Sequence, residues 1–100
     1  MPVKVFIKRT YPKDRDLEKD LFSCIREIRS LVPQQQGYVS SEYLKPLDNS
    51  NEITSISCWF SLEDWNAWLE SNERKKIQNK IDNLQGVKTE YTIYRNIKTR

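Results

Sequence analysis

Three tryptophans and a few nearby hydroxyl side chains are the residues of this chain best suited to binding a small molecule. The tryptophans all lie within one short stretch, at Trp59, Trp65 and Trp68. Each ring buries roughly 150–250 Å², so the simplest interpretation is that they pack in a core or an interface. The alternative is a pocket in which Trp59 and Trp68 meet a ligand, with Ser57 and Tyr38 supplying hydroxyl groups.

The residue types that the chain lacks exclude several kinds of catalysis. There is no histidine, which excludes a histidine general base and imidazole ligation of a metal. The two glycines, Gly37 and Gly86, rule out a glycine-rich loop for phosphate or dinucleotide binding. The two cysteines, Cys24 and Cys58, are far apart in the sequence and form no zinc-binding pattern. We therefore expect no metal and no cofactor, and the sequence assigns no catalytic residue.

Cofactor-free oxygenation is a reaction that suits a chain with so little catalytic machinery. An electron-rich substrate can react with oxygen by itself once it is bound as its anion. The protein then contributes a dry pocket, orientation, and hydrogen-bond donors for the developing charge. None of these contributions requires a histidine, a metal-binding cluster or a phosphate-binding loop.

Length and composition indicate one folded domain covering residues 1–100. Hydrophobic residues make up 37% of the chain and charged residues 31%, a balance typical of a soluble protein. The net charge of +3 comes from basic and acidic residues that alternate, without the basic stripe that nucleic acid requires. No apolar run is long enough to span a membrane, and no secretory signal is recognised. These features predict a cytoplasmic protein with both cysteines reduced and packed in the core.

The spacing of apolar residues predicts six elements in the order strand, helix, strand, strand, helix, strand. The strands are expected over residues 3–8, 38–44, 52–60 and 87–97. The first helix begins with an aspartate cap at Asp14 or Asp16 and stops at Pro33. The second helical region starts at Ser61, breaks at Ser71 and continues to a left-handed end at Gly86. This order predicts an α+β ferredoxin-like fold, with a four-stranded antiparallel sheet and helices on one face.

Both faces of the predicted sheet carry apolar residues. In the first strand Val5 and Ile7 share one face, whereas Phe6 lies on the other. In the last strand Ile93 and Tyr94 are likewise on opposite faces. Helices can cover only one face of such a sheet, so the second face needs another cover. We expect that cover to be a second copy of the chain, in a homodimer whose sheets meet face to face.

Short motifs around the tryptophans resemble the antibiotic biosynthesis monooxygenase family. They are Gly37-Tyr38, Trp59-x-Ser61, Trp68-Leu69 and Ser71-x-Glu73-Arg74. The resemblance covers nearly the whole chain in element order and implies a dimeric α+β barrel. It also implies an oxidoreductase, a cofactor-independent monooxygenase acting on an aromatic or polyketide-like small molecule. The alternative is a dimer that binds a small molecule, or serves in a stress response, without catalysis.

The haem-degrading members of this family point to two further pocket candidates. That branch uses an asparagine on the first strand, a tryptophan at the end of the third strand, and an iron-binding histidine on the second helix. Trp59 matches the tryptophan, whereas Lys8 and Gln78 stand at the other two positions. Lys8 and Gln78 are therefore pocket candidates, with a solvated position as the alternative for both. Haem degradation is not expected without the imidazole ligand. A cofactor-free oxygenase of this family would use polar groups around the tryptophan, and the candidates are Ser55, Ser57, Tyr38, Arg74 and Tyr91. The alternative for Arg74 is an exposed helix face formed by the run Glu73-Arg74-Lys75-Lys76.

Overall fold

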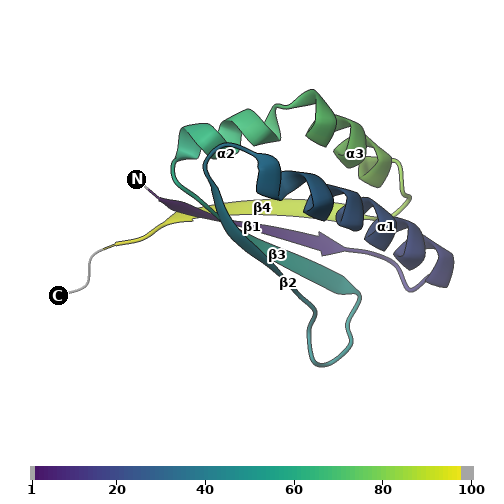
Figure 1. Ribbon diagram of the computed structural model, residues 1–100. Coiled ribbons are helices and arrows are strands. Elements are labelled where there is room, and N and C mark those ends of the chain that lie inside the picture. The colour runs from purple at the N-terminus through teal and green to yellow at the C-terminus, as the bar shows by residue number, and fades with distance from the viewer. Residues whose placement is uncertain (1, 98–100) are drawn as a thin grey trace.

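A computed structural model describes residues 2–97 and contains a four-stranded sheet with helices on one face (Figure 1). The strands are β1 (Val3–Thr10), β2 (Tyr38–Leu44), β3 (Glu52–Trp59) and β4 (Lys88–Arg95). The helices are α1 (Arg15–Leu31), α2 (Leu62–Leu69) and α3 (Asn72–Asp82), with a short 3₁₀ turn η1 (Val32–Gln34) after α1. All neighbouring strands are antiparallel, in the order β2-β3-β1-β4. The predicted α+β ferredoxin-like fold is confirmed.

Side-chain caps set where the helices begin. Asp14 caps α1, because its carboxylate accepts the backbone N–H groups of Asp16 and Leu17 at 3.0 and 3.1 Å. Ser61 caps α2 and Ser71 caps α3 in the same way, each through its hydroxyl oxygen. The second helical region ends earlier than predicted, at Asp82, because Gly86 takes its left-handed conformation in the turn that follows α3.

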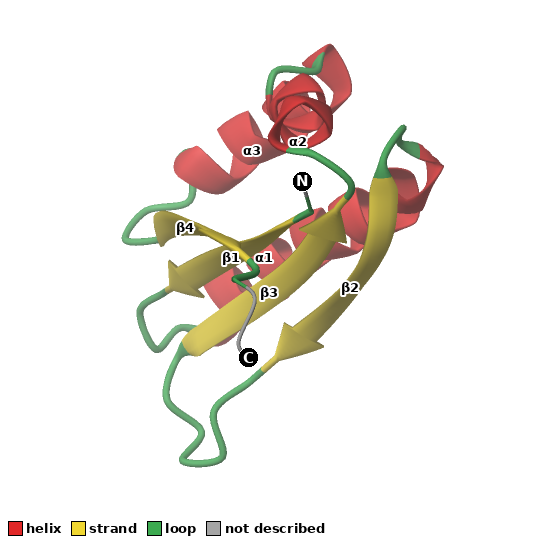
Figure 2. Cartoon of the chain, turned by 90° about the vertical axis from the view of Figure 1, so that its left-hand side faces the viewer, coloured by secondary structure: helices red, strands yellow, loops and turns green. Residues whose placement is uncertain are grey.

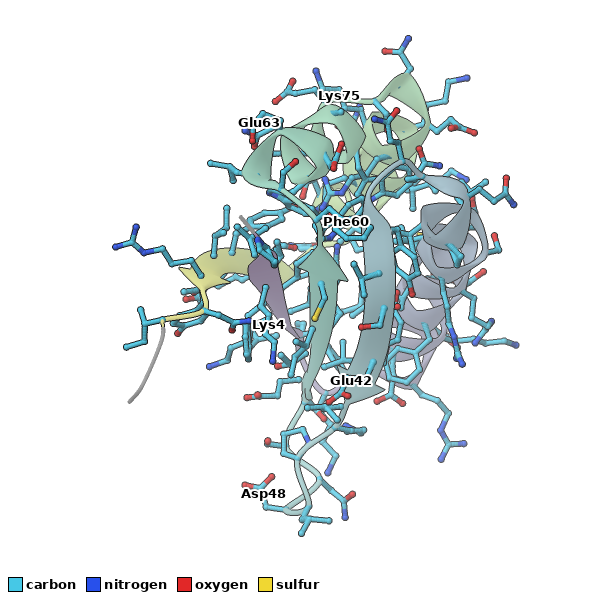
Figure 3. All side chains as sticks on the ribbon, turned by 60° about the vertical axis from the view of Figure 1, so that its left-hand side comes forward. Lys4, Glu42, Asp48, Phe60, Glu63 and Lys75 are labelled. Carbon is cyan, nitrogen blue, oxygen red and sulfur yellow. The ribbon has the colours of Figure 1, made fainter. Side chains whose placement is uncertain are left out.

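Strand alternation divides the sheet into a covered face and an open face. Val3, Val5 and Ile7 of β1 point toward the helices and are buried with Leu21, Trp65 and Ile81. Lys4, Phe6 and Lys8 of β1 point the other way, to a face that none of the described helices covers (Figure 2). Lys4 and Glu42 mark this open face in Figure 3.

The open face carries an apolar patch made of Phe6, Ile56 and Tyr94. Phe6 and Tyr94 pack edge to face with their ring centroids 5.0 Å apart. Ile56 lies beside Phe6 in the sheet. Cys58 also belongs to this face, opposite Lys4, and it is only half-buried. The expectation that both cysteines lie in the core is therefore correct for Cys24 and wrong for Cys58, because the alternation of β3 turns Cys58 away from the helices.

Gly37 holds the entry of β2 against the start of α2, and replacing it is expected to destabilise the fold. Its φ is +82°, and a Cβ atom there would overlap the carboxylate of Asp64, which accepts the Ser61 hydroxyl. Gly37→Ala should lower the free energy of unfolding by about 1–3 kcal/mol, from backbone strain and overlap together. Urea denaturation measures the effect, with the exposed neighbour Gln36→Ala as the control. Equal stability of the two variants would contradict this account of the turn.

Candidate functional site

A small cavity lies between the helices and the covered face of the sheet. Its volume is ≈ 20 Å³, which holds about one water molecule. The walls combine aliphatic side chains of β1, α1 and η1 with the rings of Tyr43, Trp65 and Trp68. The polar lining comes from two arginines and three serines, namely Arg9, Arg74, Ser41, Ser55 and Ser57. Polar groups from every layer of the fold therefore meet at one buried point.

Arg9 enters this cavity because β1 continues its inward alternation past Ile7. Its side chain is buried, with 2% of its surface exposed. The guanidinium Nη2 donates a hydrogen bond to Oε1 of Gln78 at 2.9 Å. Burial lowers the pKa of Arg9 to about 10; repulsion from Arg74 acts in the same direction, while Tyr91, Tyr43 and Asp82 oppose it. The side chain therefore remains a cation at neutral pH.

Arg74 reaches the same cavity from the first turn of α3. It too has only 2% of its surface exposed, so Arg74 takes the pocket position and not the exposed position expected of its charged run. The reason is helical spacing, because Arg74 lies on the same face as the buried Ile77. Its Nη2 donates to the Tyr91 hydroxyl at 2.7 Å, and its guanidinium carbon lies 5.6 Å from the ring centroid of Trp65. An aromatic ring and a hydroxyl therefore hold this cation.

The two guanidinium groups carry buried charge, and no carboxylate within residues 2–97 contacts either of them directly. Within residues 2–97, neither Arg9 nor Arg74 forms a salt bridge with a carboxylate. The Nε atoms of both arginines and the indole Nε1 of Trp65 are buried donors without an acceptor. Each such donor costs about 1–3 kcal/mol of stability when left unpaired. A ligand with an anionic, acceptor-rich group would satisfy this set of donors.

Trp59 lies outside the lining of the cavity and supports it from behind. Its ring is fully buried, packed against Tyr38 and Trp65 with ring centroids 5.8 Å apart in both pairs. Its indole Nε1 donates to the hydroxyl of Ser57 at 3.0 Å. Four of the predicted pocket residues line the cavity directly, namely Ser55, Ser57, Trp68 and Arg74. Trp59 therefore does not line the cavity itself, but it contacts two residues that do, Ser57 and Trp65.

The other predicted pocket residues take three different positions. The Tyr38 hydroxyl bonds to that of Ser41 at 2.8 Å, one step away from the cavity. Gln78 accepts from Arg9 and donates through Nε2 to Asp82 at 2.9 Å, so it positions Arg9. The prediction that Lys8 lines the pocket is wrong, because strand alternation places this residue on the open face. Its Nζ lies there 4.0 Å from Oε1 of Glu52. Lys8 therefore does not belong to this cavity.

Sequence reasoning missed Arg9 and Tyr43 as lining residues, and for Arg9 a signal was present. The alternation Val3, Val5, Ile7 leads directly to Arg9 as the next inward position of the strand. An arginine at such a position is unusual, because arginine is rarely buried without a partner. That conflict between pattern and residue type is the signal of a functional position.

The described residues offer little other reactive chemistry. Among residues 2–97, no group of three or more cysteine, aspartate and glutamate side chains is placed to hold a metal ion. Burial raises the pKa of the Cys24 thiol, which disfavours its reactive thiolate. None of the helices in this part of the chain is both long and apolar enough to cross a membrane.

Comparison with known proteins places the chain in a family. The sequence profile described as antibiotic biosynthesis monooxygenase matches residues 12–80. No curated protein sequence shows significant similarity to the chain.

Solved structures share the fold at low sequence identity. SnoaB from Streptomyces nogalater, a cofactor-independent oxygenase, superposes with a TM-score of 0.83 at 15% identity, covering 98% of this chain and 95% of SnoaB. Rv0793 from Mycobacterium tuberculosis superposes with a TM-score of 0.84 at 16% identity, covering 99% and 98%. A conserved protein from Methanosarcina mazei gives 0.84 at 16% identity, covering 97% and 94%. These similarities agree on the fold of the whole chain.

Proposed function

Because the chain belongs to the antibiotic biosynthesis monooxygenase family, we propose that it is a cofactor-independent monooxygenase acting on an aromatic or polyketide-like small molecule. The observation that carries the proposal is the buried pair Arg9 and Arg74, which lies beside Trp65 and Trp68 and has no carboxylate partner among residues 2–97. Two cations can hold an ionised substrate, and two aromatic rings can flank its plane. SnoaB, which shares the fold, is described as a cofactor-independent oxygenase.

The proposed reaction converts a methylene group that is conjugated with a ketone through an aromatic ring into a carbonyl group. The methylene loses a proton to water and forms an enolate, whose oxygen lies between Arg9 and Arg74. Oxygen adds to the enolate carbon and, with one proton, forms a hydroperoxide, which loses water to leave the new carbonyl. One CH₂ group and one O₂ thus give one C=O group and one H₂O. The arginines favour the first step because opposite charge stabilises the enolate more than the ketone.

Anthrone, a tricyclic ketone with such a methylene, is a suitable probe for this activity. We expect the protein to accelerate conversion of anthrone to anthraquinone, with one oxygen consumed per quinone formed. The rate should persist after dialysis against a metal chelator and without added flavin. Oxygen uptake and quinone absorbance give the two readouts. A rate equal to that in buffer, or equal in the protein and an Arg9→Met variant, would contradict the proposal.

A second candidate function is binding without catalysis, and two observations favour it. The cavity holds only ≈ 20 Å³, and no carboxylate from residues 2–97 lines it as a general base. In that case the arginine pair would hold an anionic ligand without promoting its oxidation. Saturable binding of an aromatic anion together with no acceleration of anthrone oxidation would select this candidate over the oxygenase.

Haem chemistry is a third possibility for this fold, and the surroundings of Gln78 argue against it. This residue stands where the haem-degrading branch has its iron ligand. Its Oε1 accepts a hydrogen bond from Arg9, and its Nε2 donates to Asp82 and Thr89. An amide oxygen that already binds a guanidinium is a weak ligand for iron. Hemin titration should therefore give no saturating Soret shift near one equivalent.

We also propose that the protein is a homodimer formed through the open face of the sheet. The apolar patch of Phe6, Ile56 and Tyr94 supports this proposal, since a 12.0 kDa chain gains stability by covering it. Light scattering at micromolar concentration should give twice the 12.0 kDa chain mass. Phe6→Glu should shift the mass toward the monomer, because it places a charge in an interface of about 2,000 Å² or more.

A matched control for the dimer experiment is Asn79→Glu, which adds the same charge on an exposed position of α3. This variant should keep the wild-type mass. A wild-type mass of one chain, or equal masses for Phe6→Glu and the control, would contradict a dimer through the open face.

A further inference from the structure

A surface groove adjoins the buried cavity on the side where α1 meets β2 and β3. The groove has a volume of ≈ 180 Å³, far larger than the ≈ 20 Å³ of the cavity. It is lined by Phe22, Ile25, Arg26, Arg29, Tyr43 and Ile53. Ile25 and Tyr43 also line the cavity, so these two side chains form the wall between the two spaces. A ligand in the groove is therefore separated from Arg9 by these two side chains.

Of the two residues in this wall, Tyr43 is the less buried and lies nearer the edge of the sheet. Ile25 is buried in the middle of the long helix α1, with 5% of its surface exposed. Tyr43 lies near the end of β2, which is an edge strand and has β3 as its one neighbour among the described strands (Figure 2). Its side chain is half-buried, and its outer neighbour is the exposed Arg29, whose guanidinium carbon lies 5.7 Å from the ring centroid. Rotation of Tyr43 toward solvent would displace the exposed Arg29 and remove the packing of the Tyr43 ring on the edge of the core.

The charge of the groove matches the charge of the cavity. Arg26 and Arg29 contribute two exposed cations to its lining, and no acidic residue from residues 2–97 lines it. The acidic neighbour Glu27 is turned to α3, where it pairs with Lys80 at 3.3 Å. A groove lined by one sign of charge attracts ligands of the opposite sign and raises their association rate. The arginines of the groove and the arginines of the cavity therefore both favour anionic ligands.

We propose that Tyr43 is the gate of the cavity, and that aromatic anions reach Arg9 and Arg74 through the groove between α1 and β2, guided by Arg26 and Arg29. The gate rests on the proposed function, because it assumes that the ligand is an aromatic anion. It also explains how a cavity of ≈ 20 Å³ admits a ring, since displacing Tyr43 joins the cavity to the ≈ 180 Å³ groove. Tyr43 and the two outer arginines then determine which ligands enter and how fast.

Stopped-flow quenching of tryptophan fluorescence by 4-nitrophenolate tests the gate, because two tryptophans line the cavity. Tyr43→Ala should raise both the association and the dissociation rate constants about tenfold, since both directions pass the same side chain. Tyr43→Trp, with a bulkier ring, should lower both. The opposite signs of the two variants separate gating from a general loss of structure, which circular dichroism checks independently.

The double variant Arg26→Gln, Arg29→Gln tests the guidance of the ligand. Its association rate constant should fall severalfold and lose most of its dependence on salt, while dissociation stays unchanged. Arg15→Gln, which removes one exposed cation at the far end of α1, is the control and should behave as the wild type.

The outcomes distinguish the gate from the proposed function. Binding by the wild type with unchanged rate constants in both Tyr43 variants would overturn the gate and leave the proposed function intact. Unchanged association in the double arginine variant would overturn guidance by the groove. Absence of any binding of 4-nitrophenolate to the wild type would overturn both proposals.

Discussion

Replacing Arg9 with methionine is expected to lower the affinity for 4-nitrophenolate by about 100-fold or more. The variant removes one of two buried cations, and truncating a buried charged partner in a complex costs about 2–5 kcal/mol. Arg74→Met should have an effect of similar size, because its guanidinium lines the same cavity. Quenching of tryptophan fluorescence at equilibrium measures the affinity. Anthrone oxidation should fall in parallel, if the enolate is the species that the arginines stabilise.

Lys8→Met is the matched control for this prediction. Lys8 neighbours Arg9 in β1 and loses the same charge, but it lies on the open face of the sheet. We expect Lys8→Met to bind the probe as the wild type does, apart from a small effect of net charge. Equal losses in Arg9→Met and Lys8→Met would mean that binding depends on overall charge and that the cavity is not the site.

The same arginine variants should be at least as stable as the wild type. A buried cation without a carboxylate partner costs desolvation free energy, and apolar replacement of buried charged groups is often stabilising by about 1–4 kcal/mol. Loss of the hydrogen bond to Gln78 offsets part of this gain in Arg9→Met. Thermal unfolding with circular dichroism measures the outcome. A cation kept at the expense of stability is the pattern expected of a binding site, so a strongly destabilised variant would instead assign Arg9 a structural role.

Trp59→Ala is expected to destabilise the fold more than any of these variants. The ring is fully buried between Tyr38 and Trp65, and removing such a ring costs about 3–5 kcal/mol. For a chain of 100 residues, the midpoint of thermal unfolding should fall by about 12 °C or more. The variant also leaves Ser57 without its indole donor. A shift of only a few degrees would contradict the packing role of Trp59.

Phenylalanine substitutions separate packing from ligand contact. Trp59→Phe keeps most of the packing and should alter stability more than affinity for the probe. Trp68→Phe changes a ring that lines the cavity and should alter affinity more than stability. The reverse assignment would show that Trp59, and not Trp68, meets the ligand.

Most of the fold follows from the sequence, because alternation and helical spacing are local. Val5 and Ile7 predict β1, Ser61 and Ser71 predict the helix caps, and the apolar open face is visible in Phe6 and Tyr94. These features depend on residues within a few positions of one another. The strand order β2-β3-β1-β4 follows once the element order is known.

The candidate site is less predictable, because it depends on which long side chains turn inward. Arg74 sits in a run of charged residues that indicates solvent, yet its place beside Ile77 on α3 buries it. Lys8 and Arg9 are adjacent cations of one strand, and the alternation of β1 indicates that Arg9 is the inward one, although it does not show which groups Arg9 meets in the core. Family resemblance directed attention to Trp59, which the structure places behind the cavity wall. Contacts between distant elements determine which inward side chains meet at one cavity, and spacing within a single element does not reveal that.

The most direct test of the central claim is the pKa of 4-nitrophenol when it is bound to the protein. Absorbance of the phenolate, titrated against pH at saturating protein, reports it. If Arg9 and Arg74 hold an aromatic anion, the pKa of the bound phenol should fall by about one unit or more, because each unit corresponds to 1.36 kcal/mol in favour of the charged form. The shift should disappear in Arg9→Met and persist in Lys8→Met. A bound phenol whose pKa is unchanged, or raised as burial alone would raise it, would contradict an anion site between the two arginines.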